Sequence, residues 1–244
     1  MRRESGTTLI EVLIAVTLLS LLSVGMLTAM RVGFMAYSKT NSKLMENRRV
    51  AGAQRVVQEQ LEGMMPVVAA CGQAAGPTLA RTAFFEGQAQ TMRLVSSFSL
   101  QQGWRGQPQI LELFVIPGEN GRGVRLVVNE IPYTGPAGTT QLCTSRTRDQ
   151  VTGGNLGVFA PVQAGPNSFV LADKLAYCRF SYFTIPLQRD VLPHWTPQWT
   201  FSGWPYAVRI EMAPLDPDPS RLQPITVTAP IHIHRSPEIQ YADY

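Results

Sequence analysis

Residues 9–30 have the sequence LIEVLIAVTLLSLLSVGMLTAM, in which Glu11 is the one charged residue. A helix of about 20 apolar residues crosses the hydrocarbon core of a bilayer, because each residue adds ~1.5 Å to its length. This stretch therefore predicts a membrane-spanning helix close to the N-terminus. A cleaved secretory signal fits it less well, since the apolar core of such a signal has only about 7–15 residues and ends at a small-residue cleavage site.

The prolines indicate where the helical part of the chain ends. All 18 of them lie from Pro66 onward, and proline interrupts helices but is common in turns and at strand edges. Before this boundary, apolar residues recur at helical steps. They are Tyr37, Leu44, Ala51, Val57, Leu61 and Met64. We therefore expect the helix to continue past the membrane, to end near Gly63, and to pack on the domain that follows.

The proline-rich part of the chain shows strand patterns separated by turns. Apolar runs and alternation predict strands at residues 93–98, 110–116, 124–128, 169–171, 175–183, 207–212 and 225–233. The stretch PGENGRG at residues 117–123 is turn chemistry, which predicts a hairpin between its two flanking strands. The expected fold class is α+β: a long N-terminal helix, membrane-spanning in its first half, packed against an antiparallel β domain of one or two sheets.

Composition and motifs exclude several classes of function. The 244-residue chain is 45% hydrophobic and 16% charged, so it is not a highly charged disordered protein. Its net charge is only +4 and its arginines are scattered, so no nucleic-acid partner is expected. The sequence contains neither a phosphate-binding loop nor a Gly-x-Ser-x-Gly nucleophile elbow. We therefore predict no catalytic residues and no enzyme activity.

The candidate metal ligands do not form a recognisable site. The histidines are His194, His232 and His234, and no Cys is spaced near the last two, whereas zinc needs about four ligands. Asp216 and Asp218 lie in a proline-stiffened loop, whereas calcium needs about six to eight oxygens. No metal and no cofactor is expected.

Three cysteines, Cys71, Cys143 and Cys178, allow three single disulfide pairings. Cys178 alternates in phase with Phe180 and is expected to face the core as a small hydrophobic residue. Cys71 follows the helix and Cys143 lies in a polar loop. Our hypothesis is that Cys71 and Cys143 form the disulfide.

The N-terminus carries a more specific pattern. The sequence Gly6-Thr-Thr-Leu-Ile-Glu11, between a short polar leader and an apolar span, resembles the cleavage motif of type IV prepilins. The resemblance implies that a prepilin peptidase cuts after Gly6, so that Thr7 becomes the new N-terminus and is N-methylated. It also implies that Glu11 pairs with the terminal ammonium of a neighbouring subunit, since opposite charges attract strongly in a low dielectric. Most members have Phe where this chain has Thr7, whereas cleavage depends mainly on the glycine, which is present at Gly6.

A second resemblance concerns residues 169–212. This part of the chain has, in order, an apolar strand, a loop with Trp195, Trp199 and Trp204, a proline and a further strand. The order resembles that of the minor pseudopilin J family of type II secretion. Minor pilins of type IV pili and competence systems have similar layouts and remain an alternative. Another alternative is a signal-anchored periplasmic enzyme or ligand-binding domain. The tryptophans either pack the loop onto the sheet or form a contact surface for a neighbouring subunit, since Trp is enriched at interface hot spots.

These resemblances imply a domain organisation and a location. Residues 1–6 would be a cytoplasmic leader, 7–30 the membrane half of the helix, 31–64 its periplasmic half, and 65–244 a periplasmic β-rich domain of a single-pass protein of the bacterial inner membrane. Basic residues after the span outnumber those in the leader, but long translocated domains override that count. The expected partners are other minor pseudopilins, the major pseudopilin, the prepilin peptidase, the inner-membrane assembly platform and membrane lipid.

Overall fold

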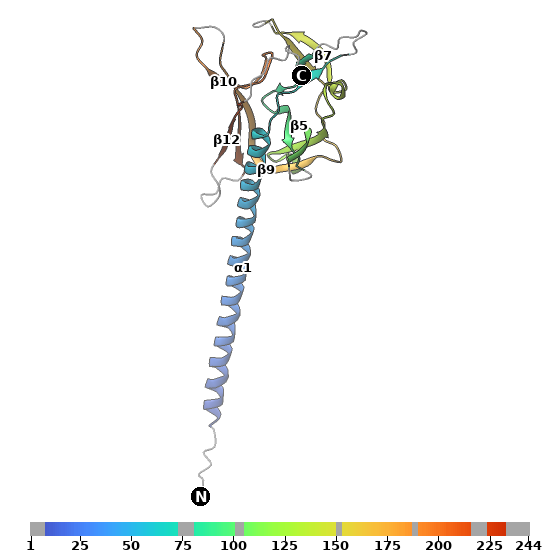
Figure 1. The fold of residues 1–244 in the computed structure, drawn as a ribbon. Helices are drawn as coiled ribbons and strands as arrows, with labels where there is room; N and C mark the ends of the chain where they lie inside the picture. The colour runs from blue at the N-terminus through green and yellow to red at the C-terminus, as the bar shows by residue number, and fades with distance from the viewer. Residues whose placement is uncertain are drawn as a thin grey trace. The chain divides into compact units, whose positions relative to one another are not determined.

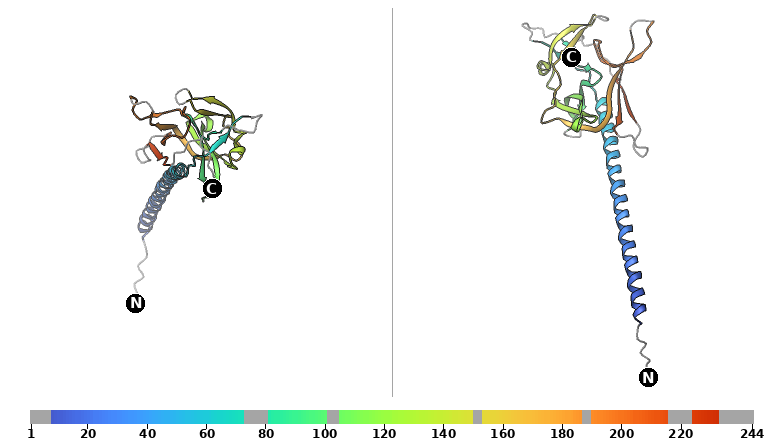
Figure 2. Two further views of the ribbon diagram at one scale, coloured as in Figure 1. Left: turned by 45° about the horizontal axis from the view of Figure 1, so that its top comes forward. Right: turned by 180° about the vertical axis from the view of Figure 1, so that it is seen from behind.

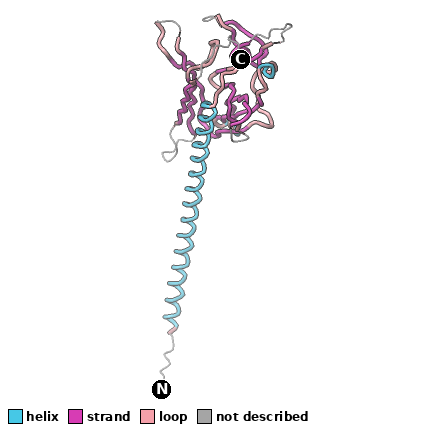
Figure 3. The backbone as a smooth tube through the Cα atoms, viewed as in Figure 1, coloured by secondary structure: helices cyan, strands magenta, loops and turns pink. Residues whose placement is uncertain are grey.

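The computed structural model describes residues 8–72, 81–100, 105–149, 153–186, 190–215 and 224–232. Figure 1 shows the ribbon with α1 and several strands labelled, Figure 2 gives two further views, and Figure 3 distinguishes helix, strand and loop. The chain divides into two compact units, Met1–Arg48 and Arg49–Tyr244. Each unit is described by itself.

Helix α1 (Leu9–Glu62) accounts for the proline-free front of the chain. The Thr8 carbonyl oxygen accepts hydrogen bonds from the amides of Glu11, at 3.0 Å, and Val12, at 3.3 Å. The helix ends one residue before Gly63, as the sequence predicts. Its continuation beyond the apolar stretch follows from the absence of proline and the abundance of helix-forming residues.

The apolar side chains that the structure describes in the first unit are exposed on every side of the helix. Leu9–Asn41 is long and apolar enough, by length and composition, to cross a membrane. Its hydroxyl groups bond within the helix: the Ser20 hydroxyl donates to the Val16 carbonyl oxygen at 2.8 Å. Three other hydroxyls donate to carbonyl oxygens one turn earlier, those of Thr17, Ser23 and Thr28. A helix whose polar groups are satisfied internally suits an apolar solvent.

In the second unit, the end of α1 contributes one face to the core. Ala53, Val57 and Leu61 recur every four residues and are at most 5% exposed, and they belong to the same apolar cluster as side chains from the strands. The predicted packing of the helix end on the β domain is therefore confirmed. The same pattern included Tyr37 and Leu44, which are 72% and 52% exposed. That part of the prediction is wrong, because the buried positions among the described helix side chains begin only at Ala53.

The second unit is built mainly of antiparallel strands. Their bounds are β1 (Val68–Ala70), β2 (Arg81–Ala83), β3 (Glu86–Gly87), β4 (Thr91–Phe98), β5 (Arg105–Pro117), β6 (Val124–Pro132), β7 (Cys143–Arg148), β8 (Asn155–Phe159), β9 (Phe169–Thr184), β10 (His194–Thr196), β11 (Ala207–Pro214) and β12 (Ile225–Pro230). The main sheet has the order β12-β11-β9-β6-β5-β4-β3, and β10 also pairs with β9. β1 pairs with β2 and β7 with β8 in two small sheets. The predicted α+β class and the β5–β6 hairpin are confirmed.

Strand β9 corrects one element of the prediction. The sequence predicts two strands, at residues 169–171 and 175–183, but the structure has one strand of 16 residues. Lys174 has a φ of 54°, and the pairing register with β6 and β11 shifts around this position. A bulge of this kind adds a residue and interrupts the alternation of inward and outward side chains. The interrupted alternation is why the sequence suggested two elements.

The main sheet curls so that its β3–β4 end meets β9. The Phe180 amide donates to the Ala89 carbonyl oxygen at 2.9 Å, and the Trp199 amide donates to the Gly87 carbonyl oxygen at 2.8 Å. Glycine is required for this approach, because a Cβ at Gly87 would lie 2.6 Å from the Tyr182 ring. The curl gives the sheet an inner face, which packs on the helix end, and an outer face.

Candidate functional site

The first candidate site is the beginning of α1. Glu11 is the acidic residue of its first turn, and its neighbours Leu9 and Ile10 are 84% and 67% exposed. A carboxylate in the first turn is stabilised by the helix dipole, but carrying it alone into a bilayer costs a few kcal/mol. The geometry therefore leaves Glu11 accessible to a cationic group on another chain. The cleavage and methylation residues predicted next to it, Gly6 and Thr7, lie outside the described residues.

The three tryptophans of the predicted contact surface have different environments. Trp204 is 5% exposed and belongs to the core, so its side chain is not available to a neighbouring subunit. Trp199 is half-buried, packs edge-on against Phe85 with ring centroids 6.4 Å apart, and donates from Nε1 to the Gly203 carbonyl oxygen at 3.0 Å. Both residues fit the alternative of a loop packed onto the sheet.

Trp195 differs from them because it lies in β10, on the outer face of the sheet. Its ring centroid is 5.2 Å from that of Phe183, its register partner in β9. The guanidinium carbon of Arg209, which lies in β11, is 3.9 Å from the Trp195 ring centroid. Of the three tryptophans, Trp195 is the one that the structure places in a half-exposed cluster of aromatic and cationic groups.

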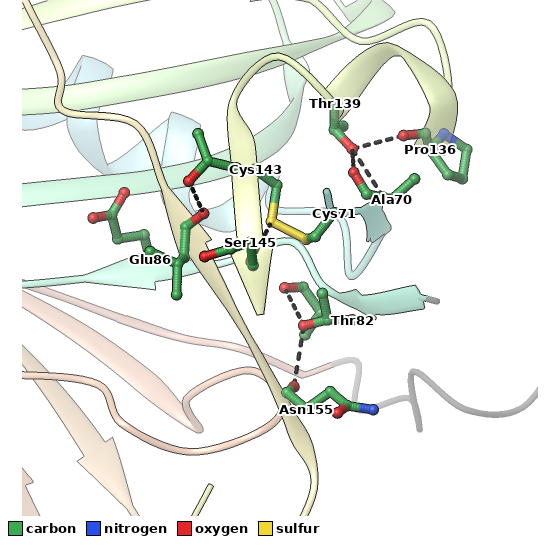
Figure 4. Close-up of a disulfide and its surroundings, with 12 residues drawn as sticks. Ala70, Cys71, Thr82, Glu86, Pro136, Thr139, Cys143, Ser145 and Asn155 are labelled. Carbon is green, nitrogen blue, oxygen red and sulfur yellow. Dashed lines mark hydrogen bonds between the residues drawn. A yellow bond between two sulfur atoms is a disulfide. The ribbon is translucent and has the colours of Figure 1, made fainter. Parts of the chain in front are cut away.

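A disulfide joins Cys71 to Cys143, the pairing that the sequence analysis favoured, with the Cα atoms 4.7 Å apart (Figure 4). It links the segment that follows β1 to the first residue of β7. Thr139 reinforces the junction, because its hydroxyl oxygen accepts a hydrogen bond from the Ala70 amide at 3.0 Å. Cys178 is buried in the core, as predicted, and burial raises the pKa of its thiol to about 12. A thiol with that pKa and burial is unreactive.

A buried charged row on the outer face was missed at the sequence level. Glu86, Arg93, Glu112 and Asn129 are direct register partners on β3, β4, β5 and β6. Arg93 is 0% exposed. Its guanidinium donates from Nε and Nη2 to Glu112 Oε1, at 2.9 and 2.8 Å, and from Nη1 to Glu86. The available signal was Glu112, a charge in the middle of an otherwise apolar strand run.

This charged row holds the segment after β8 against the sheet. Arg93 Nη2 donates to the Ala160 carbonyl oxygen at 2.9 Å, and Asn129 Nδ2 donates to Glu112 at 2.8 Å and to the Gln163 carbonyl oxygen at 3.0 Å. One guanidinium faces two carboxylates. Burial raises the pKa of Glu86 above its usual range, although the Arg93 charge acts in the opposite direction. The groups of the row bond to one another and fix the segment after β8 to the outer face of the sheet.

The other candidate ligands are dispersed. His194 and His232 are exposed, whereas Asp216, Asp218 and His234 lie outside the described residues. Within the described part of the chain, no three His, Cys, Asp or Glu residues are grouped to hold a metal ion. An open pocket of about 460 Å³ beside the disulfide is lined by Cys71, Gly72, Thr144, Ser145, Arg146, Thr147, Arg148 and Asn155. This lining offers no pair of nucleophile and general base.

Comparison with known proteins bears on the N-terminus. Residues 1–27 match the family model described as the prokaryotic N-terminal methylation motif. No curated protein matches the chain. The matched residues include Glu11 and the first part of the exposed apolar helix, so the comparison and the geometry concern the same segment. The motif indicates that this chain is a type IV pilin-like protein, either a pilin or a pseudopilin.

Proposed function

We propose that this chain is a minor pseudopilin of a type II secretion system, which assembles into the tip of a short periplasmic pseudopilus. The observation that carries the proposal is the N-terminal methylation motif at residues 1–27, which continues into a helix that is exposed over its whole apolar length. The choice of secretion rests on the resemblance of residues 169–212 to the J family. The function is structural rather than enzymatic.

In this proposal the helix has two successive environments. Residues 1–6 are a cytoplasmic leader, residues 7–30 anchor the chain in the inner membrane before assembly, and residues 31–64 and 65–244 lie in the periplasm. During assembly the apolar helix leaves lipid for the helices of neighbouring subunits. Pairing of Glu11 with the ammonium of a neighbour's first residue stabilises that transfer, because each charge alone is costly in an apolar medium.

The partners follow from the same scheme. The prepilin peptidase acts on the leader at Gly6 and Thr7, and the new terminus is N-methylated. The major pseudopilin, the other minor pseudopilins and the inner-membrane assembly platform contact the helix and the β domain. A minor pilin of a type IV pilus or competence system would use the same residues at the N-terminus. Deletion of the chain distinguishes the two roles. Loss of protein secretion would support the pseudopilin role, whereas loss of pilus display or DNA uptake would support the minor pilin role.

The first prediction concerns processing. Expressed in membranes with a prepilin peptidase, the chain should begin at Thr7; without the peptidase it should begin at Met1. Intact mass and N-terminal peptide mass of the membrane-extracted protein measure this directly, and an added methyl group would appear as a mass increase of about 14 Da. The matched control is Gly6→Val, which should remain uncut. A start at Met1 in the presence of active peptidase would overturn the pilin-like reading and favour an uncleaved anchor.

The second prediction separates processing from assembly. Glu11→Ala should be cleaved normally at Gly6, because the cut lies outside the changed side chain, yet should be recovered in sheared or cross-linked filaments at less than a tenth of the wild-type level. Loss of one buried charge pair of this kind costs about 3–5 kcal/mol, far more than the 1.4 kcal/mol of a tenfold change. Glu11→Asp, which keeps the charge, should retain partial assembly. Wild-type assembly of the Ala variant would refute the pairing.

A further inference from the structure

The outer face of the sheet carries an ordered cluster of aromatic and cationic side chains that the proposed function has not yet used. We define the platform as Tyr177, Arg179, Phe183, Trp195 and Arg209. These side chains come from β9, β10 and β11; in Figure 1, β10 and β12 lie on the opposite side of the second unit from β7. Their strands present the opposite side to the core, where Val208 and Ile210 are 0% exposed.

Arg209 is held in place across three strands. Its register partner on β9 is Ser181, a small residue that leaves room for the arginine to cross β9 and reach the Trp195 ring, 3.9 Å away. Nε of Arg209 is buried and has no hydrogen-bond partner in the described part of the chain. Arg179 is arranged in the same manner over Tyr177, with 5.2 Å from its guanidinium carbon to the ring centroid. Stacked guanidinium groups are pre-organised to bind a carboxylate through their free N–H edges.

The platform is continuous with an exposed apolar tip. The connection between β9 and β10 exposes Ile185 at 45%, Val191 at 40% and Leu192 at 81%. Because β9 and β10 are paired from Thr184↔His194 to Tyr182↔Thr196, this tip directly extends the platform around Phe183 and Trp195. Apolar side chains grouped at a surface mark interaction sites more often than scattered ones do. Tip and platform together combine exposed aliphatic groups with Trp, Tyr and Arg, the residues that dominate protein–protein hot spots.

The charges of platform and tip single out Arg209 as the group that binds an anion of the partner. Along residues 177–183 of β9, residues 190–196 and residues 207–212 of β11, the charged side chains are Arg179, Asp190, Arg209 and Glu211. Glu211 is the register partner of Arg179, whereas the register partner of Arg209 on β9 is Ser181. A flat aromatic face would also accept a sugar or lipid, but the protruding aliphatic tip needs an apolar pocket and the guanidinium groups need an anion, and a folded protein surface supplies both.

We infer that this platform and tip form a docking surface for the β domain of another pilin-like subunit, which places a carboxylate on Arg209 and apolar side chains around Leu192. The inference rests on the proposed function and adds to it the surface used and the chemistry of the partner. It assigns Trp195, rather than Trp199 or Trp204, as the aromatic anchor. Rim charges of this type also set the rate of encounter, so association is expected to weaken with added salt.

The experiment uses the full chain in its own membrane. A photo-crosslinking phenylalanine derivative is incorporated at Leu192, and the probes are the other pilin-like subunits of the same cell, each carrying an epitope tag. Crosslinking to one tagged subunit is expected. Arg209→Glu should reduce that product at least tenfold at equal protein abundance, and Arg209→Gln several-fold. The matched control is Arg146→Glu, which makes the same charge change at an exposed position of β7 and should leave the product unchanged.

Two further measurements make the outcome decisive. Protease resistance of the β domain checks that the Arg209 variants are folded, and reversal of the contacted acidic residue of the partner to Arg should restore crosslinking of Arg209→Glu. Equal crosslinking by Arg209→Glu and wild type, or products with lipid alone, would overturn the inference. The proposed function is judged separately: a chain that starts at Thr7 and assembles but never crosslinks from position 192 refutes the docking surface and leaves the pilin-like assignment intact.

Discussion

Replacing Arg93 by Met should lower the free energy of unfolding of the β domain by about 3–5 kcal/mol, the cost of removing one member of a buried ion pair. The guanidinium is 0% exposed and is the cation that faces both Glu86 and Glu112 in the charged row. Without it, two carboxylates remain on β3 and β5, on either side of β4, with no compensating cation among the described residues of the row. The segment after β8 would also lose its hydrogen bond from Arg93 to the Ala160 carbonyl oxygen.

Denaturant unfolding of the detergent-solubilised full chain, followed by tryptophan fluorescence, measures this effect. Arg125→Met is the control, because Arg125 also faces two carboxylates, Asp173 and Glu119, but at the surface. Exposed pairs are screened by water and salt, so that variant should change stability far less. The double variant Arg93→Met with Glu112→Leu should regain part of the loss, since it removes one uncompensated charge. If the Arg93 change lowered the free energy of unfolding as little as the Arg125 change, the buried row would not be a stabilising element.

Removing the disulfide by Cys71→Ser with Cys143→Ser should destabilise the β domain by about 4 kcal/mol, the loop-closure value for a sequence separation of 72 residues. The bond closes a loop that contains β2 to β6, so the unfolded chain without it gains many conformations. The folded state loses the covalent link between β1 and the β7–β8 hairpin. Their remaining links are weaker contacts, such as the hydrogen bond from the Gly72 amide to the Cys143 carbonyl oxygen at 3.1 Å.

Thermal unfolding with and without reductant tests this prediction. Wild type should lose stability on reduction, whereas the double serine variant should already be at the lower value and not respond. Cys178→Ala is the control, because it leaves the disulfide intact and should keep the full response to reductant. If Cys178→Ala abolished that response, the pairing would involve Cys178 instead.

The strands differ in how clearly their sequence predicts them. The hairpin β5–β6 and the half-buried strand β11 were predictable, since alternation along six or more residues reports which side faces the core. Strands β1, β2 and β3 contain two or three residues each, too few to show a period, and β7 and β8 lie in polar sequence. The bulge at Lys174 concealed that β9 is continuous. The fold class was recoverable, but the sheet order and its curl were not.

The candidate sites divide in the same way. Glu11 within its apolar stretch and the Gly6 motif were evident because both are local patterns, and a family model of residues 1–27 matches them. Trp195, Trp199 and Trp204 looked equivalent in the sequence. The structure separates them: Trp204 is in the core, Trp199 packs on the β3 edge, and Trp195 lies under Arg209 on the outer face. The direction in which a loop side chain points depends on its contacts with residues that are distant in the sequence.

Local patterns in the sequence are enough to predict an apolar helix of membrane-spanning length, its pilin-like N-terminus and an antiparallel β domain. These properties depend on composition and on periodicities of two and 3.6 residues, which are local. Long-range contacts, by contrast, place Glu86, Arg93, Glu112 and Asn129 in one row, bring Gly87 to Trp199 through the curl of the sheet, and let Arg209 cross Ser181 to reach Trp195. Those contacts join residues from separate strands, and the register that aligns them is set by the packing of the whole sheet.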